Sequence, residues 1–161
     1  NRSQIEKDMA RAAPLAGADG LKAMAYVRDN AERYKLSADR IGFIGFSAGG
    51  AVTAYVACHA DAKSRPDFIA PIYAGLGALK DQPVPENAPP MFIVAATNDP
   101  LGLAADSLTL YTKWLEAKKS VELHMYSKGG HGFGMKTQNL PSDQWIERFH
   151  EWMGAQGYLS E

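Results

Sequence analysis

A serine between two glycines is the part of this sequence with the clearest chemical meaning. In Gly45-Phe46-Ser47-Ala48-Gly49 the serine stands where an apolar stretch gives way to small residues. The pattern G-x-S-x-G at such a place is typical of a tight strand-to-helix turn that presents a serine hydroxyl as a nucleophile. We expect Gly45 and Gly49 to pass close to each other, so that a Cβ atom on either would collide with backbone. The alternative is a glycine turn that carries a surface serine.

A serine hydroxyl becomes a good nucleophile only when a base removes its proton, so the sequence must also supply a histidine. Of the four histidines, His59 and His150 fall in expected helices and His124 in an expected strand, where structural roles are more common. His131 instead lies in the glycine-rich segment 129–134, after the last expected strand. Glycines allow the backbone to place an imidazole at a sheet edge without steric conflict. We predict that His131 is the general base, because the alternative, a phosphate-binding turn, lacks either of the usual glycine patterns.

The imidazole needs a carboxylate that fixes its tautomer and stabilises the imidazolium formed during acyl transfer. Asp99 is the best candidate, because it follows the expected strand 91–96 after a short turn. Asp106 is instead predicted to be a favourable charge at the start of a helix. The remaining candidate acids are interpreted as loop residues: Asp61, Asp67 and Asp81.

The hydrophobic pattern predicts the elements that must position these side chains. Apolar residues recur every three or four positions in the helical stretches, and short apolar runs between turns indicate strands. The run 40–46 is apolar without alternation, as expected for a parallel strand buried on both faces. The prolines of segment 74–90 exclude a helix there. The expected elements are helix 17–34, strand 40–46, helix 48–60, strand 68–73, strand 91–96, helix 103–118, strand 121–126 and helix 142–156, the last capped by Ser142.

Strands and helices alternate along the whole chain, which indicates an α/β fold. We expect a mostly parallel sheet with helices on both faces and right-handed crossovers, in one domain that spans residues 1–161. All strands of a parallel sheet point the same way, so residues that directly follow strands meet at one edge. Ser47, Asp99 and His131 each follow a strand, and we therefore predict that they lie together at that edge.

Composition limits the classes of partner. The 161 residues are 46% hydrophobic and 22% charged, which is ordinary for one compact domain. Seventeen basic and eighteen acidic residues give a net charge of -1, so neither a nucleic acid nor a membrane partner is expected. The only cysteine, Cys58, cannot form an internal disulfide and is predicted to be a buried small hydrophobe. The histidines lack a ligand spacing such as H-E-x-x-H, so no metal site is expected.

Taken in order, these motifs resemble the esterase/lipase group of α/β-hydrolases, particularly its acetyl-xylan-esterase-like and hormone-sensitive-lipase-like members. The resemblance rests on segments 39–50, 98–101 and 121–134 and on the chain order Ser, Asp, His. It implies the α/β-hydrolase fold and hydrolysis of short-chain carboxylic esters, without a cofactor, through an acyl-enzyme on Ser47. The backbone N–H of Ala48 is expected to be one oxyanion donor.

The start of the sequence departs from the pattern of this group. Relatives begin with additional strands and an oxyanion loop of the His-Gly-Gly type, which does not occur upstream of Ser47. Strand 40–46 normally lies in mid-sheet, so without an upstream neighbour it would expose an unpaired apolar edge. We therefore expect this chain to be the C-terminal part of an α/β-hydrolase domain with the N-terminal strands missing. Its expected partner is the N-terminal part of the same domain, as a separate chain, a cleaved piece or another segment.

The expected function is hydrolysis of small-molecule or carbohydrate-linked esters, acetyl esters of carbohydrates among them. Segment 74–90, between two central strands, is too short for a large helical lid that would shelter long acyl chains. Two alternatives stay open at this point. One is a serine peptidase of the prolyl-oligopeptidase type, and the other is a noncatalytic binding module with the hydrolase fold.

Overall fold

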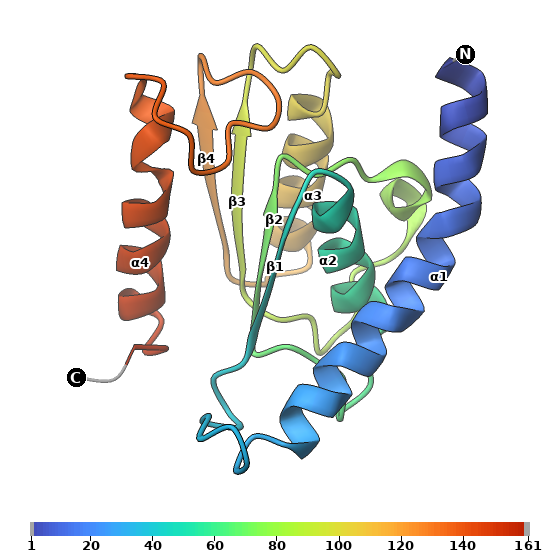
Figure 1. Ribbon diagram of the computed structural model, residues 1–161, viewed down its shortest axis with the longest axis vertical. Coiled ribbons are helices and arrows are strands. Elements are labelled where there is room, and N and C mark those ends of the chain that lie inside the picture. The colour runs from blue at the N-terminus through green and yellow to red at the C-terminus, as the bar shows by residue number, and fades with distance from the viewer. Residues whose placement is uncertain (1, 160–161) are drawn as a thin grey trace.

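The computed structural model describes residues 2–159, with side chains from residue 11 onward. Within them, four parallel strands form a sheet in the order β1-β2-β3-β4 (Figure 1). Phe46 pairs with Ile72, Ile72 with Val94, and Ala96 with Tyr126, so the strands end close to one edge. The strands are β1 (Gly42–Phe46), β2 (Phe68–Ile72), β3 (Met91–Ala96) and β4 (Val121–Tyr126).

Helices cover both faces of this sheet. The helices α1, α2 and α3 lie on one side and α4 on the other (Figure 1), which confirms the predicted α/β architecture. None of the helices in the described residues is both long and apolar enough to cross a lipid bilayer. Their bounds are Arg2–Asp29 for α1, Ala48–His59 for α2, Ala104–Glu116 for α3 and Trp145–Ala155 for α4, with 3-10 helices η1 at Gly77–Asp81 and η2 at Pro141–Gln144.

The two central strands are fully buried, and their side chains alternate between the two layers of core. Phe92 and Val94 of β3 pack in the layer beneath α4, together with its Phe149 and Trp152. Met91 and Ile93 pack on the opposite side, in a cluster that includes Trp114 of α3. Because both layers are apolar and closely packed, the carboxyl ends of the strands are held as a rigid platform.

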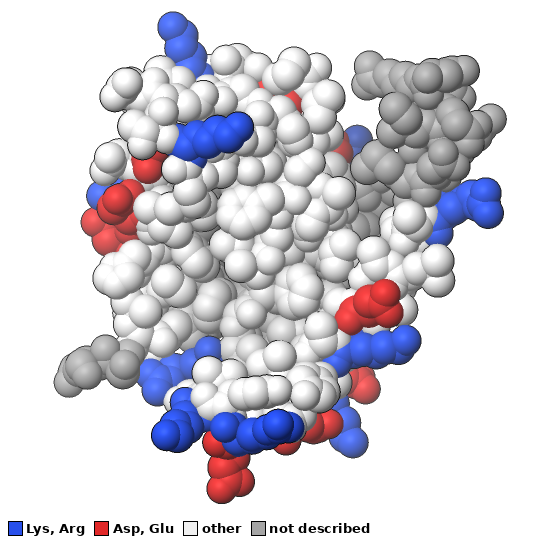
Figure 2. Space-filling view, viewed as in Figure 1, with Lys and Arg blue, Asp and Glu red and all other residues white. Residues whose placement is uncertain are grey.

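The edge strand β1 differs from the prediction that strand 40–46 is buried on both faces. Ile44 is 43% exposed and Phe46 is 39% exposed. The Phe46 ring is covered only in part, by Tyr73 with ring centroids 6.0 Å apart and by Trp145 at the start of α4 with centroids 5.9 Å apart. The face over β1, between α4 and α1, shows almost no charged side chains (Figure 2). Within the described residues β1 pairs only with β2, so the unpaired strand edge that we expected is present there.

The first helix also differs from its predicted bounds. It runs from Arg2 to Asp29 and includes Pro14, whereas the hydrophobic spacing predicts a helix over 17–34. The helix ends early because the side chain of Asn30 donates to the carbonyl oxygen of Tyr26 and the following backbone turns tightly. The remaining helices begin and end within two residues of their predicted bounds, apart from the last one.

Two short 3-10 helices were not predicted. The first, η1, lies at the front of segment 74–90, so the prolines exclude a helix only from Pro83 onward. The second, η2, takes the place of the predicted start of the last helix, and α4 begins only at Trp145. Ser142 is therefore not its cap. The Ser142 side chain is fully buried and its Oγ makes no hydrogen bond within the described residues.

Candidate active site

Ser47 lies in a strained turn between β1 and α2. Its backbone has φ 53° and ψ -115°, a conformation that side-chain-bearing residues rarely adopt. The Ser47 N–H donates to the carbonyl oxygen of Ile72 at 2.9 Å, which ties the turn to the end of β2. Strain of this kind is concentrated at functional sites and persists only where the surrounding structure enforces it. The predicted strand-to-helix turn is confirmed.

The glycines of this turn have unequal roles. A Cβ atom on Gly45 would lie 2.1 Å from the carbonyl oxygen of Gly49, so the predicted collision is confirmed for Gly45. It is wrong for Gly49, because a Cβ atom there would meet nothing within 4 Å. The second crowded position is Gly50, where a Cβ atom would lie 2.7 Å from that of Ala74. The close approach therefore involves the backbone of Gly49 and not the space beside its Cα.

This asymmetry gives a stability prediction. Replacing Gly45 with alanine is expected to lower the free energy of unfolding by about 3 kcal/mol, because the clash is with backbone that cannot move aside. Replacing Gly49 with alanine is the matched control, and it should raise that free energy by up to about 1 kcal/mol, since Gly49 lies in the first turn of α2. Urea unfolding followed by circular dichroism measures both values. Equal destabilisation by the two variants would contradict the conclusion that Gly45 is crowded and Gly49 is not.

His131 lies in the loop after β4, residues 127–135, which we call the histidine loop. Three glycines of this loop, Gly130, Gly132 and Gly134, have φ values of 71°, 72° and 48°. Such values are readily available to glycine and strain other residues, which explains why glycines surround the histidine. The loop brings the imidazole Nε2 of His131 to 2.8 Å from Oγ of Ser47.

Asp99 completes the chain of contacts. Its side chain has no exposed surface, and its Oδ2 lies 2.8 Å from Nδ1 of His131. The other oxygen, Oδ1, accepts the backbone N–H of Leu101 at 2.8 Å and so fixes the carboxylate plane. With the Nδ1 proton donated to Asp99, the lone pair of Nε2 faces the Ser47 hydroxyl. The structure thus brings together the three side chains that the sequence predicts at 47, 99 and 131.

The other histidines lie elsewhere, as expected. His59 stacks on Tyr55 with ring centroids 4.0 Å apart, at the end of α2. His124 pairs with Glu122 on β4 at 2.7 Å, and His150 is exposed on α4. None of these contacts involves the Ser47 turn.

The remaining acids serve the framework. Asp106 lies in the first turn of α3, as predicted, but it is also buried, where it accepts the N–H of Leu76 and pairs with Lys80 at 2.6 Å. Asp67 pairs with Arg28 of α1 at 3.1 Å. These contacts join loops and helices to the sheet and leave Asp99 as the carboxylate beside His131.

Two residues near His131 were missed in the sequence. Asn98 accepts the backbone N–H of Gly130 through its Oδ1 at 2.8 Å. Tyr73, directly after β2, is 3% exposed, has φ 38°, and places its ring centroid 5.1 Å from that of His131. Burial raises the pKa of the Tyr73 hydroxyl, partly offset by a backbone hydrogen bond with Gly134. Both residues closely follow strands in the sequence, and this position was the signal that could have placed them at the same edge as Ser47.

Ala48 and Cys58 lie in α2. Because Ala48 is the first residue of that helix, its backbone N–H has no acceptor within the helix and is free to bind an oxyanion. Cys58 is half-buried beside the core cluster of α3, and burial raises the pKa of its thiol. A thiol with a raised pKa is a weak nucleophile, in agreement with the predicted role of Cys58 as a small hydrophobe.

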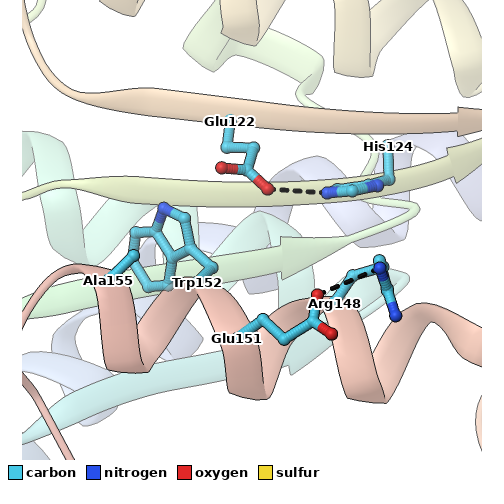
Figure 3. Close-up of a pocket in the computed structure, with 6 residues that line it drawn as sticks. All are labelled: Glu122, His124, Arg148, Glu151, Trp152 and Ala155. Carbon is cyan, nitrogen blue, oxygen red and sulfur yellow. Dashed lines mark hydrogen bonds and ion pairs between the residues drawn. The ribbon is translucent and has the colours of Figure 1, made fainter.

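A cavity of about 330 Å³ lies between β4 and α4, away from Ser47 (Figure 3). Its charged side chains are already paired, Glu122 with His124 at 2.7 Å and Arg148 with Glu151 at 3.0 Å. The cavity contains neither a strained residue nor any of the three side chains joined at the Ser47 turn. We therefore place the candidate active site at Ser47, on the basis of the geometry there.

Comparison with known proteins agrees with this architecture. A family model described as the dienelactone hydrolase family matches residues 2–156. An acetylxylan esterase of Xylanibacter ruminicola is 26% identical over 157 residues, covering 79% of this chain and 33% of that protein.

Two solved structures resemble the fold. The acetyl ester-xyloside bifunctional hydrolase from Caldicellulosiruptor lactoaceticus has a TM-score of 0.82 and 23% identity, over 89% of this chain and 66% of that one. MGS-M1, an alpha/beta hydrolase enzyme from a Medee basin deep-sea metagenome library, has a TM-score of 0.76 and 25% identity, over 85% of this chain and 62% of that one. The chain thus spans less than two thirds of the length of each relative. The predicted α/β-hydrolase fold is confirmed.

Proposed function

Since this chain belongs to the dienelactone hydrolase family, we propose that it carries the catalytic residues of a carboxylic ester hydrolase. The nucleophile is Ser47, the general base is His131 and the orienting acid is Asp99. One observation carries this assignment, the continuous relay from Ser47 Oγ to His131 Nε2 and from His131 Nδ1 to Asp99 Oδ2, with both distances at 2.8 Å. Such a relay on a strained serine is the arrangement that acyl transfer requires.

The proposed reaction consists of two acyl transfers. Ser47 Oγ attacks the ester carbonyl carbon while His131 Nε2 takes the hydroxyl proton, and the imidazolium then gives that proton to the departing alcohol. Water attacks the acyl-enzyme in the second half, again with His131 as base, and the carboxylic acid leaves Ser47. Asp99 keeps the imidazole oriented and offsets its positive charge in both halves.

The developing oxyanion is bound by the backbone N–H of Ala48. This donor is well placed, because it belongs to the residue after the nucleophile and points out of the first turn of α2. Removal of one donor of this kind typically costs about 10²- to 10³-fold in rate. Ala48 therefore accounts for an appreciable share of the expected rate enhancement.

The proposed substrate is an ester of a short acyl group, such as acetyl, with a carbohydrate as the alcohol. Segment 74–90 forms only η1 and extended turns, which leaves no helical lid over the Ser47 turn from that side. An acetylxylan esterase and an acetyl ester-xyloside hydrolase are among the similar proteins, which supports this substrate class.

The acyl preference is tested with p-nitrophenyl esters of increasing chain length. The full protein is expected to hydrolyse the acetate with a kcat/KM about tenfold or more above that for the decanoate, since an open site gives long chains little surface to bind. An aminoacyl p-nitroanilide in the same series tests the peptidase alternative. Faster hydrolysis of the decanoate would contradict the short-acyl proposal, and faster hydrolysis of the anilide would overturn the esterase assignment.

A further inference from the structure

The histidine loop needs more support than the residues of the relay provide. His131 stands among three glycines with positive φ, and glycine has more backbone freedom in an unrestrained chain than any other residue. A general base must stay within hydrogen-bonding distance of the hydroxyl that it deprotonates. The bond from Asp99 restrains only the tip of the side chain, so other contacts must restrain the backbone and the ring.

Asn98 restrains the backbone. Its Oδ1 accepts the N–H of Gly130 at 2.8 Å, and the adjacent Asp99 holds the adjacent His131. Two neighbouring residues of one turn thus bind two neighbouring residues of the other. Because Asn98 is exposed, loss of its side chain leaves no buried group without a partner, and the fold should tolerate the change.

Tyr73 restrains the ring. Its aromatic ring contacts the imidazole of His131 in an edge arrangement, with centroids 5.1 Å apart and planes at 67°. The same ring packs against Phe133 of the loop at 4.7 Å and against Phe46 at 6.0 Å. Its backbone φ of 38° is strained for an aromatic residue, and strain that persists at such a site indicates that the position is needed.

We propose that Asn98 and Tyr73 are positioning residues that hold His131 against Ser47. Asn98 acts through its hydrogen bond with the backbone of Gly130, and Tyr73 acts through the contact of its ring with the imidazole. This proposal rests on the proposed function of Ser47 and His131. Neither residue touches the reacting atoms, so each acts only through the orientation of the base.

The test uses Asn98→Ala and Tyr73→Leu in the full protein, with a fluorophosphonate probe that reacts with an activated serine. The rate of labelling reports how well Ser47 is activated, whereas the final extent of labelling reports how much protein is folded. Each variant is expected to slow labelling about tenfold at an unchanged extent, because a displaced base costs up to about 10²-fold. Asn98→Asp and Tyr73→Phe keep the acceptor and the ring respectively and should restore most of the rate.

Asn87→Ala is the matched control, since Asn87 is exposed in the loop before β3, at the opposite end of the sheet from Asn98. It should label at the wild-type rate. A wild-type rate with a reduced extent in Asn98→Ala or in Tyr73→Leu would show a purely structural role and remove that residue from the proposal. Failure of Asn98→Asp to restore the rate would also remove Asn98 from the proposal. A Tyr73→Phe rate no higher than that of Tyr73→Leu would overturn the contact between the Tyr73 ring and the imidazole as the means by which Tyr73 acts.

A second measurement separates this proposal from the function on which it rests. If the wild-type protein is not labelled at all, the proposed function fails, and hydrogen exchange of segment 127–135 still tests the restraint. Faster exchange in Asn98→Ala and Tyr73→Leu than in Asn87→Ala would support the restraint of the loop. Equal exchange in all three variants would overturn it.

Discussion

Replacing Ser47 with alanine is expected to lower kcat for p-nitrophenyl acetate by about 10⁶-fold, because no acyl-enzyme can form without the hydroxyl oxygen. The substitution removes the Oγ atom, which is hydrogen-bonded to His131 Nε2 at 2.8 Å, and leaves the rest of the turn in place. Release of p-nitrophenol, measured with the purified full protein, gives the rate. Circular dichroism of the same sample establishes that the variant is folded.

Ser120→Ala is the matched control for this experiment. Ser120 is exposed between α3 and β4, and the contact that the described residues show for it is made by its backbone oxygen, which accepts the N–H of Met91. Its replacement should leave kcat unchanged. A Ser47→Ala protein that hydrolyses the ester at the wild-type rate would end the assignment of Ser47 as nucleophile.

Replacing His131 with alanine should be nearly as damaging, with a loss in kcat of about 10⁶-fold, because nucleophile and base act as a unit. Without the imidazole no group lies within hydrogen-bonding distance of Ser47 Oγ to take its proton, among the contacts that the structure shows. The same p-nitrophenyl acetate assay measures the effect. The combined Ser47→Ala, His131→Ala protein should be no slower than either single variant.

His150→Ala provides the control, since His150 is exposed on α4 and should be replaceable without loss of activity. If His131→Ala retained more than a small fraction of the wild-type rate, another group would have to be the base. The double variant gives a second test. If the losses in kcat caused by Ser47→Ala and His131→Ala added in free energy, the two residues would act independently, which would contradict a shared proton relay.

The sheet and the meeting of three side chains at one edge of it were predictable from the sequence for one physical reason. Buried parallel strands have apolar runs bounded by turn residues, and β3 and β4 have the bounds expected from these runs. Once the strands are located and known to be parallel, the residues that follow them must share an edge. Ser47, Asp99 and His131 could therefore be placed together without knowledge of any contact between them.

Features that depend on packing between distant segments could not be predicted. The burial of Ser142 depends on the 3-10 turn that Pro141 begins, and the crowding at Gly50 depends on Ala74, two residues after β2. The aromatic contact of Tyr73 with His131 likewise joins residues far apart in the chain. Local patterns carry information on strands and turns, whereas these contacts exist only after the sheet has formed.

The exposure of β1 has the same origin. An apolar run indicates burial, but how much of each side chain is covered depends on the neighbouring elements that pack there. Ile44 and Phe46 remain 43% and 39% exposed, although Phe46 contacts Trp145 at the start of α4. The apolar pattern of strand 40–46 therefore predicted the strand correctly and the burial of its outer face incorrectly.

The most direct test of the central claim is to find which residue of the full protein becomes covalently modified. The protein is treated with a fluorophosphonate, digested, and the labelled peptide is sequenced by mass spectrometry. We predict a single adduct on Ser47, which requires an activated hydroxyl beside His131. A fully folded protein that stays unlabelled, or that is labelled at another residue, would contradict the account.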